Sequence, residues 1–165
     1  MAGVRKAVEP GFEDLFRHHY PRLVRALALA AGPEEAADAV QEAFIAAHRH
    51  WKRISGYDDP AGWVRRVAVN RLSNRRRSLG RRDRAVRRLG GERLGPDRPA
   101  ADLDLAAAVA ALPQGQRLAV GLFYLADLPV AEVAEAMGIT AGTVKSQLHD
   151  ARRSLAAHLE VFDDA

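Results

Sequence analysis

The sequence predicts an all-α fold of two small helical domains joined by a flexible linker, the C-terminal one a helix-turn-helix. Apolar residues recur at three- and four-residue spacing along most of the 165 residues. Aromatic residues make up only 6% of the chain, so the core must consist mainly of Ala, Leu and Val, which favours helices over sheets. A glycine- and proline-rich stretch, residues 89–101, has no periodicity and divides the chain.

These features predict the domain boundaries. We expect an N-terminal tail over residues 1–11, a first domain over 12–88, a linker over 89–101 and a second domain over 102–160. Domains of this size are at the margin of independent stability, so each is expected to depend on a partner for part of its stability.

The first domain begins with two expected helices. The first starts near Phe12 and contains Pro21, which should kink or divide it. Gly32-Pro33 marks a boundary, and the next helix runs from Pro33 to Trp51, with acidic residues in its first turn. The apolar stripes of these helices are Leu15, Phe16, Tyr20, Leu23, Val24 and Leu27 in the first, and Val40, Ala43, Phe44, Ala47 and Trp51 in the second.

Turn-forming residues over 52–62 predict a loop, followed by a third helix from residue 61 or 62 to beyond Arg77. Its core-facing side is Trp63, Val64, Val67, Ala68 and Leu72, and its opposite side is Arg66, Asn70, Ser73, Asn74 and Arg77.

The net charge of +4 conceals a strong local asymmetry. Residues 65–88 contain eleven arginines and one acid, Asp83, whereas residues 33–42 contain acids and no base. Nothing nearby in the sequence neutralises the arginines, which makes a nucleic-acid phosphate backbone the obvious partner. An ordinary solvated charged face is the alternative interpretation.

The second domain is expected to start at Asp102 with a helix that ends before Pro113. A second helix over 113–126 should bury Leu118, Leu122 and either Tyr124 or Leu125. The apolar positions of the first of these helices are Leu103, Leu105, Ala106, Val109, Ala110 and Leu112.

The stretch from residue 127 to 159 has the helix-turn-helix pattern. Gly138 suits a left-handed C-cap, and Thr140 can cap the following helix. The inward positions of that helix are Val144, Leu148, Ala151 and Leu155, and its outward positions are Lys145, Ser146, His149, Arg152 and Arg153. A polar, basic outer face of this kind fits a DNA major groove, although an ordinary helical hairpin has the same apolar pattern.

No catalytic set is present in the sequence, so we expect neither an enzyme nor a cofactor. HExxH, phosphate-loop and GxSxG motifs are absent. The pairs His18-His19 and His48/His50 are spaced poorly for one metal on a helix, and Asp58-Asp59 lacks residues to complete a cation shell.

Composition also suggests a compartment. The chain has no cysteine, which excludes disulfides and thiolate metal sites and fits a reducing cytoplasm. The N-terminus lacks the apolar run of a signal peptide, and no stretch is long enough to span a membrane, so we expect a cytoplasmic protein.

Three motifs in order, AADAVQEAF, PAGWVRRVAVN and LPVAEVAEAMGITAGTVKSQLHDAR, resemble those of bacterial RNA polymerase sigma factors of the extracytoplasmic function (ECF) group, in an actinobacterial-like form. The resemblance covers about residues 12–160. It implies a protein that binds core polymerase and directs promoter-specific initiation by reading and melting the minus-10 element and reading the minus-35 element.

The resemblance also implies roles for particular residues. Polymerase binding falls on a helix face that the pattern alone would assign to solvent: Asp38, Gln41, Glu42 and Ile45. Minus-10 recognition falls on Ser55, Gly56, Tyr57 and Asp58 in the loop, extending to Asp59, and on Arg66, Asn70, Arg71, Asn74 and Arg75 in the helix after it. Minus-35 recognition falls on Thr143, Lys145, Ser146, His149 and Arg152.

Two positions depart from the family pattern, because relatives often carry Arg where this chain has Gln147 and Asp150. They leave the minus-35 preference open. The implied partners are the clamp helices and flap of core polymerase, promoter DNA and, as in many relatives, an anti-sigma factor. The free protein is expected to be a monomer.

Three other functions are compatible with parts of the sequence. A helix-turn-helix repressor or activator that works without polymerase explains residues 127–159 alone, and predicts a dimer on a palindrome. A recombinase or nuclease would need a carboxylate cluster or nucleophile, neither of which is evident. An RNA-binding protein using the arginine tract would bind tightly, without sequence preference and with steep salt dependence.

Overall fold

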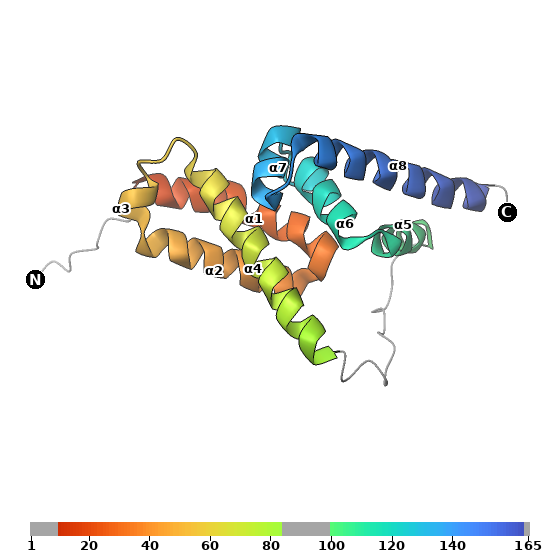
Figure 1. The fold of residues 1–165 in the computed structure, drawn as a ribbon, viewed down its shortest axis with the longest axis horizontal. Coiled ribbons are helices and arrows are strands. Elements are labelled where there is room, and N and C mark those ends of the chain that lie inside the picture. The colour runs from red at the N-terminus through yellow and green to blue at the C-terminus, as the bar shows by residue number, and fades with distance from the viewer. Residues whose placement is uncertain (1–9, 84–99, 164–165) are drawn as a thin grey trace, which may run out of the picture.

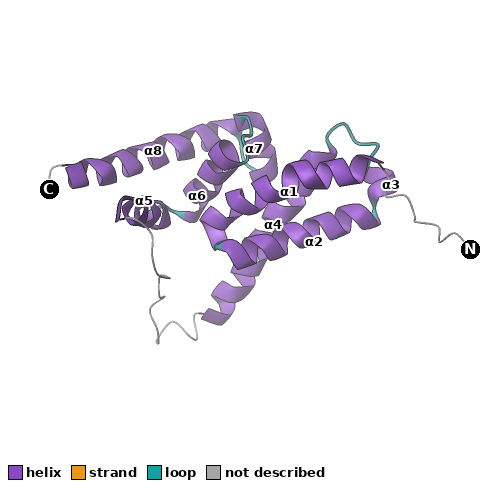
Figure 2. Ribbon diagram, turned by 180° about the vertical axis from the view of Figure 1, so that it is seen from behind, coloured by secondary structure: helices purple, strands orange, loops and turns teal. Residues whose placement is uncertain are grey.

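Every element over residues 10–83 and 100–163, the part of the chain described by this computed structural model, is helical (Figures 1 and 2). In chain order the elements are α1 (Pro10–Ala31), α2 (Pro33–Arg49), α3 (Trp51–Ile54), α4 (Pro60–Asp83), α5 (Ala100–Ala111), α6 (Gln114–Val120), the π-helix η1 (Gly121–Leu125), α7 (Val130–Met137) and α8 (Ala141–Asp163). No helix in these two ranges combines the length and hydropathy required to cross a membrane.

In the first domain α2 packs against both α1 and α4, and α4 crosses over them diagonally (Figure 1). The predicted stripe of α2 is confirmed, since Val40, Ala43, Phe44 and Ala47 are buried. Helix α1 begins at Pro10, two residues earlier than expected. It also continues through Pro21, so of the two expectations for this proline, a kink or a division of the helix, the division is wrong.

Burial on both sides of Pro21 explains this continuity. An interior proline costs about 3 kcal/mol, because it removes one backbone hydrogen bond and crowds the preceding turn. Leu23, Ala26, Leu27 and Ala30 are buried just after the proline. Each fully buried leucine contributes roughly 1.5–3 kcal/mol, so packing of this turn offsets the cost.

The connection between α2 and α4 is shorter than the expected loop. Trp51 and Ile54 are buried, and they hold the short helix α3 against the domain, which leaves only residues 55–59 as loop. Asp59 then starts α4, since its Oδ1 accepts a hydrogen bond of 2.8 Å from the backbone N–H of Gly62. The carboxylate cap and the proline at the first helical position account for the start at Pro60.

In the second domain the helix after Pro113 changes its winding. The N–H of Ala126 donates to the Gly121 carbonyl, five residues back, at 3.0 Å. Leu118 and Leu122 are buried as predicted, but Tyr124 and Leu125 are 52% and 41% exposed, so the expectation that one of them is buried is wrong. The wider π turn shifts the helical phase after Leu122 and brings Ala126 inward instead.

The first helix of this domain is less buried than expected. In α5, Ala108 and Leu112 are buried, whereas Leu105 is exposed and Val109 is half-buried. Residues 84–99 lie outside the described ranges, and with them most of the expected linker. Ala100 and Ala101, assigned to that linker, are the first residues of α5.

The helix-turn-helix is confirmed by its caps. Gly138 has φ 68°, the left-handed conformation expected at the end of α7, and it has no Cβ to strain there. The side-chain oxygen of Thr140 accepts from the N–H of Thr143 at 3.2 Å and caps α8. On α8 the inward residues Val144, Leu148 and Ala151 are buried, and Leu155 is half-buried.

The two domains share one hydrophobic core. Helix α1 contacts α6 and η1, and α4 contacts α7, which lies between α4 and α8 in Figure 1. Leu118, Leu122 and Val133 of the second domain belong to the same buried cluster as Leu27 and Val64 of the first. Each domain therefore covers apolar surface of the other.

Candidate nucleic-acid interface

Helix α4 presents a row of polar side chains away from the core. Arg66, Asn70 and Asn74 are exposed and follow one another at four-residue spacing, which places them on one face. On the opposite side Val64, Ala68 and Leu72 are buried and hold the helix against α1 and α2. A guanidinium and two amides in a row can contact both phosphates and base edges.

Arg71 and Arg75 lie on a different side of α4, facing α2. Arg71 Nη1 is 3.0 Å from Glu42 Oε2, Arg75 Nη1 is 3.1 Å from Asp38 Oδ2, and Arg75 also pairs with Glu42. Hydrogen bonds to Asp38 and then Glu42 raise the pKa of Arg75 above its ordinary value. The idea that nothing neutralises the arginine run is therefore wrong, because α2 supplies acids that the local sequence pattern could not pair with it.

The four residues implied in polymerase binding divide between two faces of α2. Asp38 and Glu42 point to the arginines of α4. Gln41 and Ile45 line an apolar groove of about 440 Å³, and Ile45 is 44% exposed. The other residues lining this groove are Phe12, Phe16, Tyr20, Phe44, His48 and Arg49.

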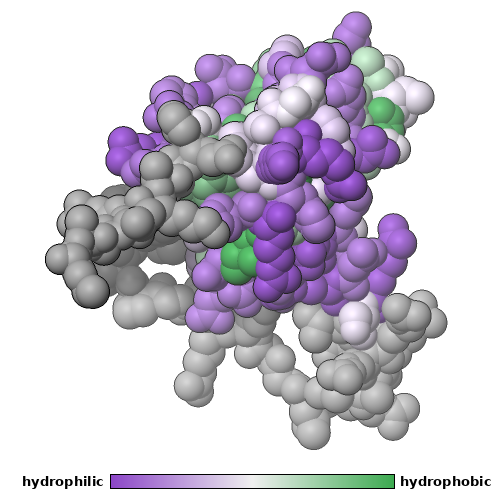
Figure 3. Space-filling view, turned by 90° about the vertical axis from the view of Figure 1, so that its left-hand side faces the viewer, coloured by the Kyte–Doolittle hydropathy of each residue, from purple (hydrophilic) through white to green (hydrophobic). Residues whose placement is uncertain are grey.

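Apolar side chains at this end of the molecule are partly exposed. Where Figure 3 shows this side in colour, small hydrophobic areas lie among hydrophilic residues. Phe16 is 40% exposed and stacks on Tyr20 with ring centroids 4.7 Å apart, which gives the groove an aromatic wall. A partner could therefore bury an apolar side chain here within a polar rim.

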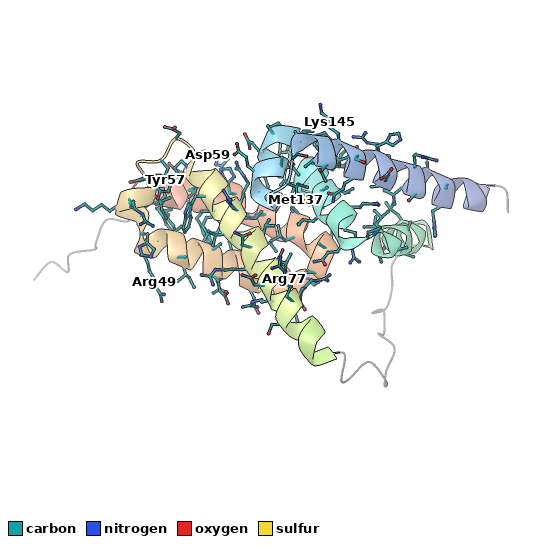
Figure 4. The ribbon with its side chains drawn as sticks, viewed as in Figure 1. Arg49, Tyr57, Asp59, Arg77, Met137 and Lys145 are labelled. Carbon is teal, nitrogen blue, oxygen red and sulfur yellow. The ribbon has the colours of Figure 1, made fainter. Side chains whose placement is uncertain are left out.

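The loop implied in minus-10 recognition is exposed and held at both ends. Ser55, Gly56, Tyr57 and Asp58 are all exposed, and Figure 4 places Tyr57 near Asp59 at one end of the molecule. The buried α3 fixes the loop's start, and the Asp59 cap fixes its end. A loop anchored in this way can present an aromatic ring without first ordering its backbone.

Arg65 is the important residue that sequence reasoning did not single out. It is only 5% exposed, and its Nη2 is 2.9 Å from Asp59 Oδ2 and 3.0 Å from Glu132 Oε2 of α7. Its spacing could have identified it, because it precedes the buried Val69 by four residues and the buried Leu72 by seven. Asp59, considered with Asp58 as a cation ligand, is thus engaged by Arg65 and by the N–H of Gly62.

His19 lies close to this pair. It borders a cavity with His18, Ser55 and Asp59. Burial lowers the pKa of His19, and the positive charge of Arg65 lowers it further, against the opposite effect of Asp59. Neutral imidazole is the form that this position favours.

The residues implied in minus-35 recognition form one exposed surface along α8. Lys145 points away from the body of the protein in Figure 4. The members of this surface are Thr143, Lys145, Ser146, His149 and Arg152, all of them exposed. The basic and hydroxyl groups suit phosphate contacts, and the serine and histidine suit base edges.

Tyr124 is a second residue that sequence reasoning misplaced. Arg152 Nε donates a hydrogen bond of 2.8 Å to the Tyr124 hydroxyl, and the guanidinium carbon is 5.9 Å from the ring centroid. Because η1 turns Tyr124 outward, the tyrosine holds Arg152, one of the residues implied in minus-35 recognition. A regular helical period gives no signal for this contact.

The two departures from the family pattern differ in position. Gln147 is half-buried against α6, where its amide nitrogen is 2.9 Å from the position that a Cβ on Gly115 would occupy. Asp150 is exposed. Of the two, only Asp150 therefore lies on the exposed surface of α8.

Comparison with known proteins agrees with this geometry. The family model Sigma-70 region 2 matches residues 15–82, which span α1 to α4, and the model Sigma-70, region 4 matches residues 102–155, which hold the helix-turn-helix. The sigma factor RpoE from Bartonella quintana, solved in complex with the anti-sigma factor NepR, has the same fold. Its TM-score is 0.75 with 23% identity, over 91% of this chain and 97% of that one.

Two curated relatives are more similar in sequence. The ECF RNA polymerase sigma factor SigL of Mycobacterium tuberculosis is 34% identical, over 97% of this chain and 95% of its own length. The ECF RNA polymerase sigma factor SigE of Mycolicibacterium smegmatis is 31% identical over 93% of this chain, which spans 63% of that relative's length. Matches at both domains and along nearly the whole of SigL lead to one conclusion: the chain belongs to the ECF group of RNA polymerase sigma factors.

Proposed function

We propose that this protein binds core RNA polymerase and directs it to promoters that carry a minus-10 and a minus-35 element. The observation that carries the proposal is the presence, in one chain, of two exposed polar helix faces, on α4 and α8, each backed by a buried apolar side. A repressor needs only the second of these faces.

At the minus-10 element, Arg66, Asn70 and Asn74 would contact the DNA directly, with arginine on phosphate and asparagine on base edges. The loop over residues 55–58 would receive a base turned out of the duplex. Unstacking costs a few kcal/mol, and an anchored loop with an exposed Tyr57 offers a ring for stacking in return.

Arg71 and Arg75 have a different role in this proposal. Their ion pairs with Glu42 and Asp38 orient α4 on α2, and they reach phosphate only when these pairs exchange for DNA. In the free protein, Glu42 and Asp38 compete with DNA phosphates for these arginines, which weakens non-specific binding to DNA.

At the minus-35 element, Thr143 and Lys145 would contact phosphate near the start of α8, while Ser146, His149 and Arg152 would face base edges. Asp150 repels phosphate but accepts from the N4 amino group of cytosine, so it would favour cytosine at the base pair it meets.

Polymerase docking would use the α2 groove. Ile45 and Gln41 give it an apolar surface with an amide beside it. We propose a binding role without catalysis, in the cytoplasm where core polymerase works. RpoE's complex with NepR makes an anti-sigma factor a reasonable further partner to propose for this chain.

The experiment is co-elution with purified core polymerase, followed by transcription from a pool of genomic fragments. Stable co-elution and initiation at a small set of fragments with two shared elements support the proposal. Ile45→Arg should abolish co-elution, whereas Leu105→Arg, at a residue 45% exposed on α5, should retain it. Tight binding to duplex DNA with no binding to core enzyme would replace the proposal with a helix-turn-helix repressor.

A further inference from the structure

We infer that Arg65 is a positioning residue for the minus-10 loop, residues 55–58: acting through Asp59, it holds the loop in the conformation that receives a base. The inference rests on the proposed function, because it concerns how this loop is prepared for DNA. It gives Arg65 a different role from its exposed neighbour Arg66, since the Arg65 guanidinium is buried and bonds to the residue that ends the loop.

Asp59 uses its two carboxylate oxygens for two different partners. Oδ1 accepts a hydrogen bond of 2.8 Å from the backbone N–H of Gly62, and Oδ2 accepts one of 2.9 Å from Arg65 Nη2. The cap alone would leave the carboxylate free to turn about its own axis, whereas two bonds in different directions fix it. Because Asp59 directly follows the loop, as Figure 4 shows, fixing its side chain also fixes the end of the loop.

Gly62 provides the space in which this carboxylate lies. A Cβ built on Gly62 would be 2.4 Å from Asp59 Oδ2 and 2.9 Å from Asp59 Cγ. The carboxylate could move away from such a methyl group only by breaking one of its two hydrogen bonds. This arrangement therefore requires glycine at position 62, although alanine is the better helix former.

Burial keeps Arg65 with Asp59. The Arg65 side chain is 6% exposed, and its Nη2 also donates to Glu132 Oε2 of α7 at 3.0 Å. Arg71 and Arg75, which pair with α2, have side chains that are 42% and 34% exposed, so they can exchange a carboxylate for phosphate. Arg65 is shielded from such an exchange, and its part in DNA recognition is indirect.

The two ends of the loop are held by different means. At its start, Gly56 N–H donates to the Arg53 carbonyl at 3.2 Å and Tyr57 N–H donates to the Ile54 carbonyl at 3.0 Å, which ties this half of the loop to the buried α3. At its end the loop depends on Asp59. Loss of the contact between Asp59 and Arg65 should therefore loosen the second half of the loop, at Asp58, and leave α3 in place.

A loop that is already ordered lowers the cost of base capture. Capture requires that a base is unstacked, and a mobile loop would in addition lose backbone entropy when it closes on that base. A preorganised loop avoids the second cost. Loss of the contact between Asp59 and Arg65 should therefore weaken capture about tenfold, or about 1.4 kcal/mol, which is on the order of the cost of ordering one residue.

The first measurement is backbone ¹⁵N relaxation on the free chain. The order parameter of the Asp58 amide should be about 0.85 in the parent, as in rigid backbone, and below about 0.6 in Asp59→Asn. Asparagine caps a helix as well as aspartate does, so the bond to the N–H of Gly62 is kept. Its second group is an amide N–H₂, which cannot accept from Arg65.

Four further variants make the result specific. Arg65→Met and Gly62→Ala should also lower the order parameter, the first by removing the donor and the second by displacing the carboxylate of Asp59. Glu132→Gln removes the other carboxylate on Arg65 without touching the loop, and should keep the parent value. So should Gly142→Ala, the matched glycine control, whose Cβ would meet nothing nearer than 3.9 Å. Dispersed amide spectra check that each variant is folded.

Combining two of these changes tests whether they act through one contact. The double variant Asp59→Asn with Arg65→Met should have a loop no more mobile than either single variant, because the second change removes nothing that the first has left. Independent effects of the two residues would instead add.

The second measurement asks whether the loop's order serves base capture. It uses the chain bound to core polymerase and a promoter fragment obtained from the transcription experiment above, with 2-aminopurine at successive minus-10 positions to identify the base that is unstacked. Asp59→Asn should weaken binding to the intact fragment about tenfold. With an abasic site at the captured position it should bind as the parent does.

The abasic fragment separates a positioning role from general damage. A variant that only destabilised the domain would bind both fragments less well. Arg66→Met provides that comparison, since loss of an exposed phosphate contact should weaken binding to both fragments and leave the loop's order parameter unchanged.

Three results would overturn the inference: a mobile Asp58 amide in the parent, an unchanged order parameter in both Asp59→Asn and Arg65→Met, or equal losses of binding to the intact and abasic fragments. Absence of co-elution of the parent with core polymerase is a different result, the failure of the proposed function. The relaxation measurement uses neither polymerase nor DNA, so the two failures are distinguishable.

Discussion

Leu122→Ala should destabilise both domains together. Leu122 lies in η1, is 0% exposed, and belongs to the core that both domains share. Truncation of a fully buried leucine costs about 3 kcal/mol, from lost transfer free energy and the cavity left behind. At about 2.1 cal/mol/K per residue, unfolding of 165 residues has an entropy of about 0.35 kcal/mol/K, so the melting temperature should fall by about 9 °C.

Differential scanning calorimetry of the full chain measures this effect. A shared core predicts one cooperative transition that moves as a whole in Leu122→Ala. The matched control is Leu125→Ala, three residues later and 41% exposed, which should lower the melting temperature by no more than about 2 °C. Two separate transitions, of which only one moves, would refute the reasoning that the domains share their stability.

Three further predictions concern the cap of α8, the pairs between α2 and α4, and His19. Thr140→Ala should lower the free energy of unfolding by about 1 kcal/mol in urea titrations, because an N–H of α8 loses its acceptor, while Thr140→Ser should not. Glu42→Gln should cost less than about 1 kcal/mol, because its ion pairs are partly exposed. It should remove the carboxylate that pairs with Arg71, while Arg75 keeps Asp38, and so steepen the salt dependence of binding to a single-stranded minus-10 oligonucleotide. Glu34→Gln, at an exposed acid of the same helix, should leave that dependence unchanged. The pKa of His19 is lowered in the folded protein and is near 6.5 in the unfolded chain, so below about pH 6.5 the unfolded chain binds more protons than the folded protein. The free energy of unfolding should therefore fall as pH drops from about 6.5 through the folded pKa. Urea unfolding midpoints measured against pH should show this loss in the parent protein and not in His19→Gln.

Much of the local structure was predictable because it depends on residues close together in the chain. The caps at Gly138 and Thr140 and the buried stripe of α2 follow from local backbone preference and the helical period. The exposure of Lys145 and Asn70 follows from the same period. Their roles toward DNA and polymerase remain proposals, because no contact within the chain reports on them.

The predictions from sequence were wrong where packing against a segment distant in the chain overrides a local conformational preference. Pro21 lies within a continuous helix because the turn after it is buried. Tyr124 is exposed because the π turn shifts the period, a change that no spacing rule anticipates. The arginines of α4 find their acids about thirty residues away, on a helix that packs beside them.

The sequence by itself determined the helices, the helix-turn-helix and the family, since each depends on short-range spacing, caps or an ordered set of motifs. The tertiary structure alone decided that the domains share a core, that Arg65 is buried between two carboxylates, and that Gly121 meets the backbone of Ala26. These facts depend on which faces meet across long separations in the chain. A hydrophobic stripe in the sequence indicates that one face of a helix is buried, but it does not indicate which other element covers that face.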